Sequence, residues 1–133
     1  MKLYKDDILK ILDKYGFFKE EYIILSGASL VLQNIKEYTT DIDIAVSNDL
    51  YNELLKKYNC SFEKEINNYK VWFIDNVINF SQHYYEETEY TKIFDYKVQT
   101  IDSILELKKN LNRSKDEEDI KAILNFCKTK NNI

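Results

Sequence analysis

Residues 38–47 have the sequence YTTDIDIAVS, in which two aspartates stand two positions apart within an apolar segment. The β-branched and apolar residues around them predict a strand. Side chains two positions apart on a strand share one face, so Asp41 and Asp43 are expected to point the same way. Because neighbouring like charges repel, this pair needs either open water or a cation between the two carboxylates.

The composition predicts a single globular domain over residues 1–133. Apolar residues make up 44% of the chain, which is enough for a core, and the formal charge of −4 does not suggest a dedicated nucleic-acid surface. No apolar run approaches the roughly 20 residues of a membrane span. The first residues show no secretory signal, and Cys60 and Cys127 have no metal-ligand spacing. We therefore expect a cytoplasmic protein without membrane contact.

Hydrophobic periodicity predicts an alternation of helices and strands on both sides of the two aspartates. The predicted helices cover residues 5–15, 26–35, 50–58, 101–111 and 114–129. The predicted strands cover residues 22–25, 41–46, 60–66, 69–74, 77–82 and 92–100, the last being a strand or an extended segment. This order predicts the α/β or α+β class, with a small mixed sheet flanked by helices and two helices at the C-terminal end.

Three segments contain residues suited to chemistry. SGASL, at 26–30, follows a strand and opens a helix, so its backbone N–H groups could approach a phosphate, although a glycine at such a turn often serves geometry alone. Asp41 and Asp43 suit a hard cation such as Mg²⁺, and solvated acids on an edge strand are the alternative. KKNLNRSKDEEDI, at 108–120, could hold a triphosphate or form a salt-bridged helix junction.

Taken together, the strand followed by SGASL, the Asp41-Ile42-Asp43 motif and the closing K-x4-R-x-K-D-x2-D motif resemble the nucleotidyltransferase superfamily, which includes DNA polymerase β. The resemblance extends from about residue 20 to 126. It is strongest to small bacterial members, the AbiEii-type transferases and the minimal nucleotidyltransferases of toxin–antitoxin cassettes. It implies a nucleotidyltransferase fold and the transfer of a nucleoside monophosphate from an NTP to a hydroxyl group.

The resemblance also implies roles for individual residues. Asp41 and Asp43 would bind Mg²⁺. Residues 26–28 would form the phosphate-binding turn and Ser29 would open the helix, with Ser26 standing where many relatives have a first glycine. Arg113 is also expected to fix the terminal helices on the sheet. The implied nucleotide-binding residues are Ser26, Gly27, Ala28, Ser29, Lys108 and Arg113.

Asn79 departs from the pattern of that family. A third carboxylate usually lies on a strand beside the Asp-x-Asp strand, and the matching stretch here, at 76–80, places Asn79 there. An amide oxygen can bind a metal, but it has no negative charge and cannot accept a proton. Asp75 in a shifted register, or Glu86 or Glu87 from the following loop, are the alternatives.

Two functions are therefore expected. In the first, the chain is a Mg²⁺-dependent nucleotidyltransferase with catalytic Asp41, Asp43 and Asn79, whose acceptor is a tRNA, a protein or a small molecule. In the second, it is a degenerate transferase fold that binds a nucleotide or a cognate partner protein without turnover. A toxin–antitoxin or defence cassette is the genetic setting that the resemblance implies.

Overall fold

A computed structural model describes residues 1–83 and 85–131. The helices are α1 (Lys5–Tyr15), η1 (Lys19–Glu21), α2 (Ser26–Leu32), α3 (Asn48–Lys57), α4 (Ile101–Leu111), η2 (Ser114–Asp116) and α5 (Glu117–Asn131). The strands are β1 (Leu3–Tyr4), β2 (Tyr22–Ile24), β3 (Tyr38–Thr39), β4 (Ile42–Val46), β5 (Ser61–Ile66), β6 (Tyr69–Ile74), β7 (Ile78–Ser81), β8 (Tyr90–Ile93) and β9 (Tyr96–Gln99). These elements form an α+β protein.

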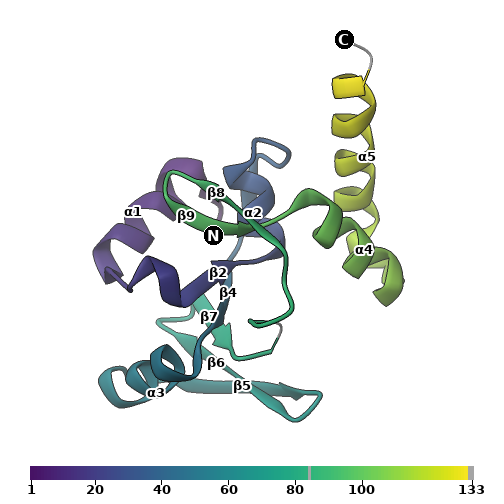
Figure 1. Cartoon of the computed structure of the whole chain (residues 1–133). Helices are drawn as coiled ribbons and strands as arrows, with labels where there is room; N and C mark the ends of the chain where they lie inside the picture. Colours follow the sequence, from purple (N-terminus) through teal and green to yellow (C-terminus); the bar gives the residue numbers. More distant parts are fainter. Residues whose placement is uncertain (84, 132–133) are drawn as a thin grey trace.

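A mixed seven-stranded sheet organises the fold, with the order β5–β6–β7–β4–β2–β9–β8 (Figure 1). At its centre, β4 runs antiparallel to β2 and parallel to β7. A second sheet pairs the short strands β1 and β3. The predicted mixed sheet with two C-terminal helices is confirmed at this level, and the strand that carries Asp43 lies in the middle of the sheet.

Helices α1 and α3 bury the apolar stripes that the sequence predicts for them. Ile8 and Leu12 of α1 and Leu50 and Leu54 of α3 are at most 2% exposed and join the main core with the central strands. Full burial of side chains of this size contributes about 1.5–3 kcal/mol each. These contacts hold the central strands, and with them the candidate site, in a fixed position.

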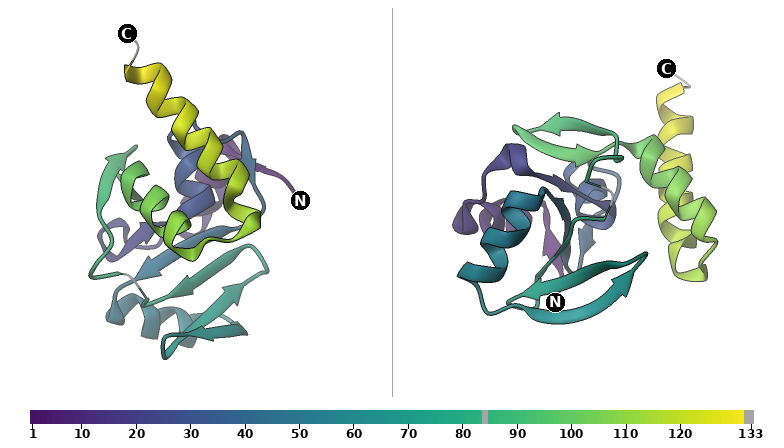
Figure 2. Two further views of the ribbon diagram at one scale, coloured as in Figure 1. Left: turned by 90° about the vertical axis from the view of Figure 1, so that its right-hand side faces the viewer. Right: turned by 60° about the horizontal axis from the view of Figure 1, so that its bottom comes forward.

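A second, smaller core joins α2 to the C-terminal helices. Leu30, Ile104 and Ile123 are fully buried against one another and come from α2, α4 and α5. Both views of Figure 2 show α4 and α5 side by side, with α5 extending away from the sheet. Because α2 contributes to both cores, it connects the sheet to the terminal helices. None of the described helices is long and apolar enough to cross a membrane.

Some boundaries differ from the sequence-based expectation. The strands predicted over 69–74 and 77–82 are confirmed and form a hairpin, in which Asp75 and Asn76 adopt the left-handed backbone of a tight turn, with φ of 52° and 56°. The segment 92–100 is not one strand, because Phe94 and Asp95 have positive φ and form a turn between the end of β8 and β9. The helix predicted over 26–35 ends at Leu32.

Candidate active site

The two aspartates lie at the beginning of β4. Asp43 is within the strand, and Asp41 immediately precedes it. The parallel register places Asn79 of β7 directly opposite Asp43, which confirms the predicted neighbourhood of these two residues. The N–H of Leu25 donates to the carbonyl oxygen of Asp43 at 2.8 Å, so the turn into α2 is fixed to the same point of the sheet.

None of the alternative carboxylates replaces Asn79 in this register. Asp75 lies in the β6–β7 turn, where its carboxylate accepts a hydrogen bond from the hydroxyl of Tyr15. Glu86 is exposed, and Glu87 lines a cavity on α4 with Ser103. The position beside Asp43 is therefore held by a neutral amide.

A polar cavity of about 320 Å³ opens beside the aspartates. Of the residues that the sequence analysis singled out, its wall contains Ser26, Gly27, Asp41, Asp43, Asn79, Lys108 and Arg113. They come from the start of α2, from two sheet strands and from the C-terminal helical segment. The predicted site residues thus meet in one place, except for the side chains of Ala28 and Ser29.

Asp43 is held in surroundings that disfavour its negative charge. Burial raises its pKa to about 7, and the charges of Asp41 and Glu63 add to the effect, while Lys64 and a hydrogen bond with Asn79 act in the opposite direction. Its Oδ1 is buried and, among the described residues, has no hydrogen-bond partner. A buried carboxylate oxygen without a partner costs free energy unless a cation or a donor occupies the space beside it.

The neighbouring Asp41 shows the same tendency. Burial raises its pKa, and the positive charges of Lys36, Lys64 and Lys115 oppose this shift. Across residues 1–83 and 85–131, no three Asp, Glu, His or Cys side chains are arranged to hold a metal ion by themselves. Two carboxylates nevertheless fit Mg²⁺, which usually keeps several water ligands and takes the rest from substrate phosphates.

The turn into α2 has a strained first residue. Ser26 has φ of 45°, in the left-handed region that glycine adopts more easily, and its N–H donates to Oε1 of Gln99 at 3.0 Å. A serine at this position therefore carries a conformational cost that a glycine would avoid. Gln99 of β9 holds this conformation of Ser26. Its own side chain is fixed by a second hydrogen bond, in which Nε2 donates to the hydroxyl of Ser103.

Ala28 and Ser29 belong to the buried face of α2. Helix α2 begins at Ser26, so Ser29 does not open it. Both side chains are buried, and the hydroxyl of Ser29 donates to the carbonyl oxygen of Gln99 at 2.7 Å. These two residues pack α2 against β9 and do not present side chains to the polar cavity.

A glycine is required at position 27 because Thr39 of β3 lies very close to it. A Cβ at this position would lie 2.7 Å from Oγ1 of Thr39, which is itself buried. We expect Gly27→Ala to destabilise the protein by about 1–3 kcal/mol, as overpacking does. This is opposite in sign to the usual gain of up to ~1 kcal/mol from replacing a helical glycine with alanine.

Urea denaturation of a double-mutant cycle tests this steric explanation. Removal of the hydroxyl in Thr39→Ala is expected to reduce the cost of Gly27→Ala, whereas Thr39→Val, which keeps the bulk, should leave the cost unchanged. An equal cost in all three backgrounds would contradict the explanation.

Lys108 and Arg113 line the cavity but are already paired. Lys108 is 5% exposed, and its Nζ lies 2.8 Å from Asp116 Oδ1 and 3.4 Å from Asp119 Oδ2. Arg113 Nε lies 2.7 Å from the other oxygen of Asp116. Burial would raise the pKa of Asp116, but hydrogen bonds from Lys108 and Arg113 outweigh it and lower the pKa. This network fixes α4 to the start of α5, while phosphate contact by either cation stays a prediction.

Breaking this buried network is expected to be costly. Lys108→Met keeps the apolar stem but leaves Asp116 with Arg113 as its one remaining cation, so the free energy of unfolding should fall by about 3 kcal/mol. Chemical denaturation measures the change, and Lys109→Met, at an exposed neighbouring position, is the control, expected within about 0.5 kcal/mol of the parent. Similar values for the two variants would show that the pair does not stabilise the junction.

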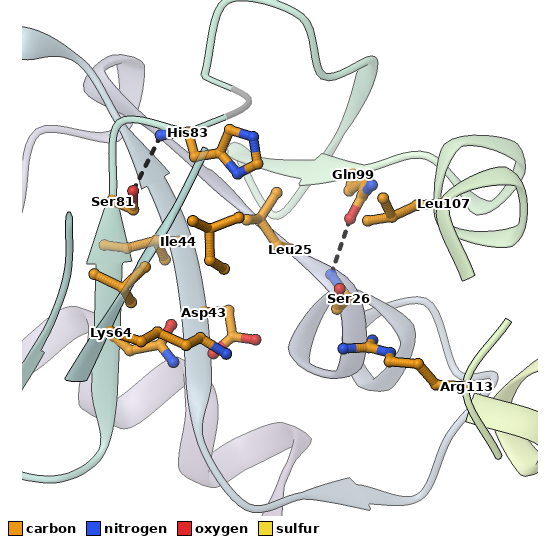
Figure 3. Close-up of a pocket in the computed structure, with 13 residues that line it drawn as sticks. Leu25, Ser26, Asp43, Ile44, Lys64, Ser81, His83, Gln99, Leu107 and Arg113 are labelled. Carbon is orange, nitrogen blue, oxygen red and sulfur yellow. Dashed lines mark hydrogen bonds between the residues drawn. The ribbon is translucent and has the colours of Figure 1, made fainter. Parts of the chain in front are cut away.

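A second cavity of about 170 Å³ adjoins the first, and Asp43 lines both (Figure 3). Its walls include the apolar side chains of Leu25, Ile44 and Leu107. Figure 3 shows Lys64 and Arg113 approaching its mouth from opposite sides. The site therefore consists of a polar cavity and a smaller, more apolar cavity, and Asp43 lines both of them.

Sequence analysis missed the contribution of β5 to this site. Glu63 and Lys64 both line the polar cavity, although consecutive residues of a regular strand point to opposite faces. The register of β5 with β6 shifts between Phe62 and Lys64, which marks a bulge at Glu63. Bulges re-aim side chains, and no sequence signal marks this one.

Comparison with known proteins finds no matching family model and no significant match among curated proteins or solved structures. The chemistry of the site is therefore argued from its geometry. Two carboxylates face a cavity whose wall also carries lysine and arginine side chains, and one of them has a buried oxygen with no hydrogen-bond partner in residues 1–83 and 85–131. Such an arrangement suits an anionic ligand that arrives together with a divalent cation.

Proposed function

We propose that this chain is a Mg²⁺-dependent nucleotidyltransferase that moves a nucleoside monophosphate from an NTP to a hydroxyl acceptor. The observation that carries the proposal is the pair Asp41 and Asp43, which faces a polar cavity with a buried, unpartnered carboxylate oxygen. The order of strand, tight turn, helix and Asp-x-Asp strand supports a nucleotidyltransferase fold. In this proposal the two carboxylates hold the cation.

The other residues of the polar cavity would bind the phosphates. Lys64, Arg113 and Lys115 line the cavity and supply positive charge, and Ser26 and Gly27 bring the start of α2 to the same wall. Bound Mg²⁺ supplies charge neutralisation at the phosphoryl group. In the transfer, the acceptor oxygen forms a bond to the α-phosphorus, the bond from that phosphorus to the bridging oxygen breaks, and pyrophosphate leaves. The hydroxyl proton passes to a carboxylate or to water.

The adjoining apolar cavity would hold the uncharged part of a substrate. Leu25, Ile44 and Leu107 provide apolar contacts next to Asp43, and His83 and Gln99 add polar groups. Small-molecule sites commonly combine apolar walls with a few orienting polar groups. The acceptor in this proposal is a tRNA, a protein or a small molecule.

Titration with nucleotides followed by a transfer assay tests the proposal. Calorimetry with ATP, CTP, GTP and UTP should show binding that requires Mg²⁺. Incubation with labelled NTP and a mixture of tRNA and cell protein should then transfer label to one acceptor class. Absence of metal-dependent nucleotide binding for all four NTPs would refute the proposal.

A second candidate function is a nucleotide- or protein-binding module without turnover. Two observations favour it: the neutral Asn79 opposite Asp43, and the pairing of Lys108 with two carboxylates. Metal-dependent NTP binding without transfer of label would support this alternative. A cognate partner protein, as in a toxin–antitoxin cassette, belongs to both versions of the proposal.

A further inference from the structure

The bulge in β5 places an additional carboxylate in the polar cavity. Phe62 pairs with Trp72, and Lys64 pairs with Val71, so Glu63 is an extra residue on its strand. An inserted residue of this kind breaks the alternation of faces. As a result Glu63 and Lys64 lie on the same side, with Lys64 Nζ 3.9 Å from Glu63 Oε1, and both line the cavity.

Asn79 connects Glu63 to Asp43. The Nδ2 of Asn79 donates to Oε2 of Glu63 at 3.3 Å, and a hydrogen bond with Asn79 also lowers the pKa of Asp43. A carboxylate only accepts hydrogen bonds, so the amide side that faces Glu63 must be the NH₂ group. Asn79 therefore donates to Glu63 from the position that pairs with Asp43 across β4 and β7.

Three carboxyl groups, those of Asp41, Asp43 and Glu63, line this corner of the polar cavity. The carboxyl groups of Asp41 and Glu63 flank Asp43 on the same cavity wall, so like charges are brought together there. Oδ1 of Asp43 is buried and has no partner within the described part of the chain, so it offers an independent indication of a missing ligand. A divalent cation beside this oxygen would relieve the repulsion among all three acids.

We propose that Glu63 supplies the third negative charge of a divalent-cation site formed with Asp41 and Asp43, acting through water bound to the cation. Contact through water agrees with the finding that no three acidic, His or Cys side chains of the described chain can ligate a metal directly. The inference rests on the proposed function and deepens it, because it places on β5 the charge that Asn79 lacks. A glutamate that is partly exposed can also accept the proton of an acceptor hydroxyl.

Calorimetric titration with Mn²⁺ alone, without nucleotide, tests this role. Glu63→Gln is expected to weaken Mn²⁺ binding by about tenfold, the lower end of the effect of outer-shell ligands. Glu65→Gln, the same change at an exposed position two residues further along β5, should leave the affinity unchanged. Glu63→Gln combined with Asn79→Asp should recover most of the loss, because the charge returns next to Asp43.

Thermal denaturation in the absence of metal gives a second readout. Glu63→Gln should raise the melting temperature, since it removes a like charge near Asp43, and Mn²⁺ should reverse the order of the two proteins. Unchanged Mn²⁺ affinity in Glu63→Gln, an equal loss in Glu65→Gln, or no binding by the parent chain would each overturn the inference. Metal titrations that behave as expected while no NTP binds would refute the proposed function alone.

Discussion

Asp43→Asn is expected to reduce nucleotidyl transfer by about 100-fold or more, because the variant removes a charge that the transition state requires. Asparagine has nearly the same shape as aspartate, so the core around Ile42 and Ile44, both at most 1% exposed, stays packed. Asp41→Asn should cause a loss of similar size, because both carboxylates face the same cavity. Initial rates with saturating labelled NTP, and calorimetry with and without Mg²⁺, measure the two effects.

Asp95→Asn is the matched control for this experiment. Asp95 is exposed in the β8–β9 turn and has φ of 69°, a conformation that asparagine also tolerates. Transfer and Mg²⁺-dependent binding should be unchanged in this variant. If Asp41→Asn and Asp43→Asn kept the activity of the control, the two aspartates would not form the centre of the site.

Local patterns were sufficient to predict most of the elements that build the site. The apolar run at 22–25 predicts β2, the small residues at 26–30 predict the turn into α2, and the apolar pattern at 41–46 predicts β4. The Asp75-Asn76 turn likewise fixes the β6–β7 hairpin, in which Asn79 stands on β7. Each of these inferences depends on residues that are close in sequence.

The remaining features depend on contacts between distant residues. The sequence leaves open whether Lys108 holds a phosphate or joins a salt-bridged junction. Its burial and its pairing with Asp116 of η2 and Asp119 of α5 become evident only in the folded chain. Phenylalanine is not a typical turn residue, so the sequence gives no sign of the left-handed conformation that Phe94 adopts. The bulge at Glu63 is a shift in the pairing register between β5 and β6. It therefore cannot be predicted from the sequence of either strand alone.

The stability difference between the parent chain and Asp43→Asn is expected to depend on pH. The ordinary pKa of the aspartate is 3.8, and in the folded protein it is raised to about 7. Between these values the folded state binds more protons than the unfolded state, so the stability of the parent falls as pH rises. Below about pH 4 the two proteins should be similar, because the aspartate is neutral in both states.

Above pH 7 the variant should be the more stable protein, by at most ~4 kcal/mol, since each unit of pKa shift corresponds to ~1.4 kcal/mol. Urea denaturation of both proteins across this pH range measures the difference directly and cancels the other titrating groups. Mg²⁺ should restore stability to the parent at alkaline pH and have no effect on the variant, because a ligand of the folded state stabilises it by mass action. A pH-independent difference would mean that Asp43 is charged in the folded protein throughout, and the electrostatic reason for a cation at this position would be lost.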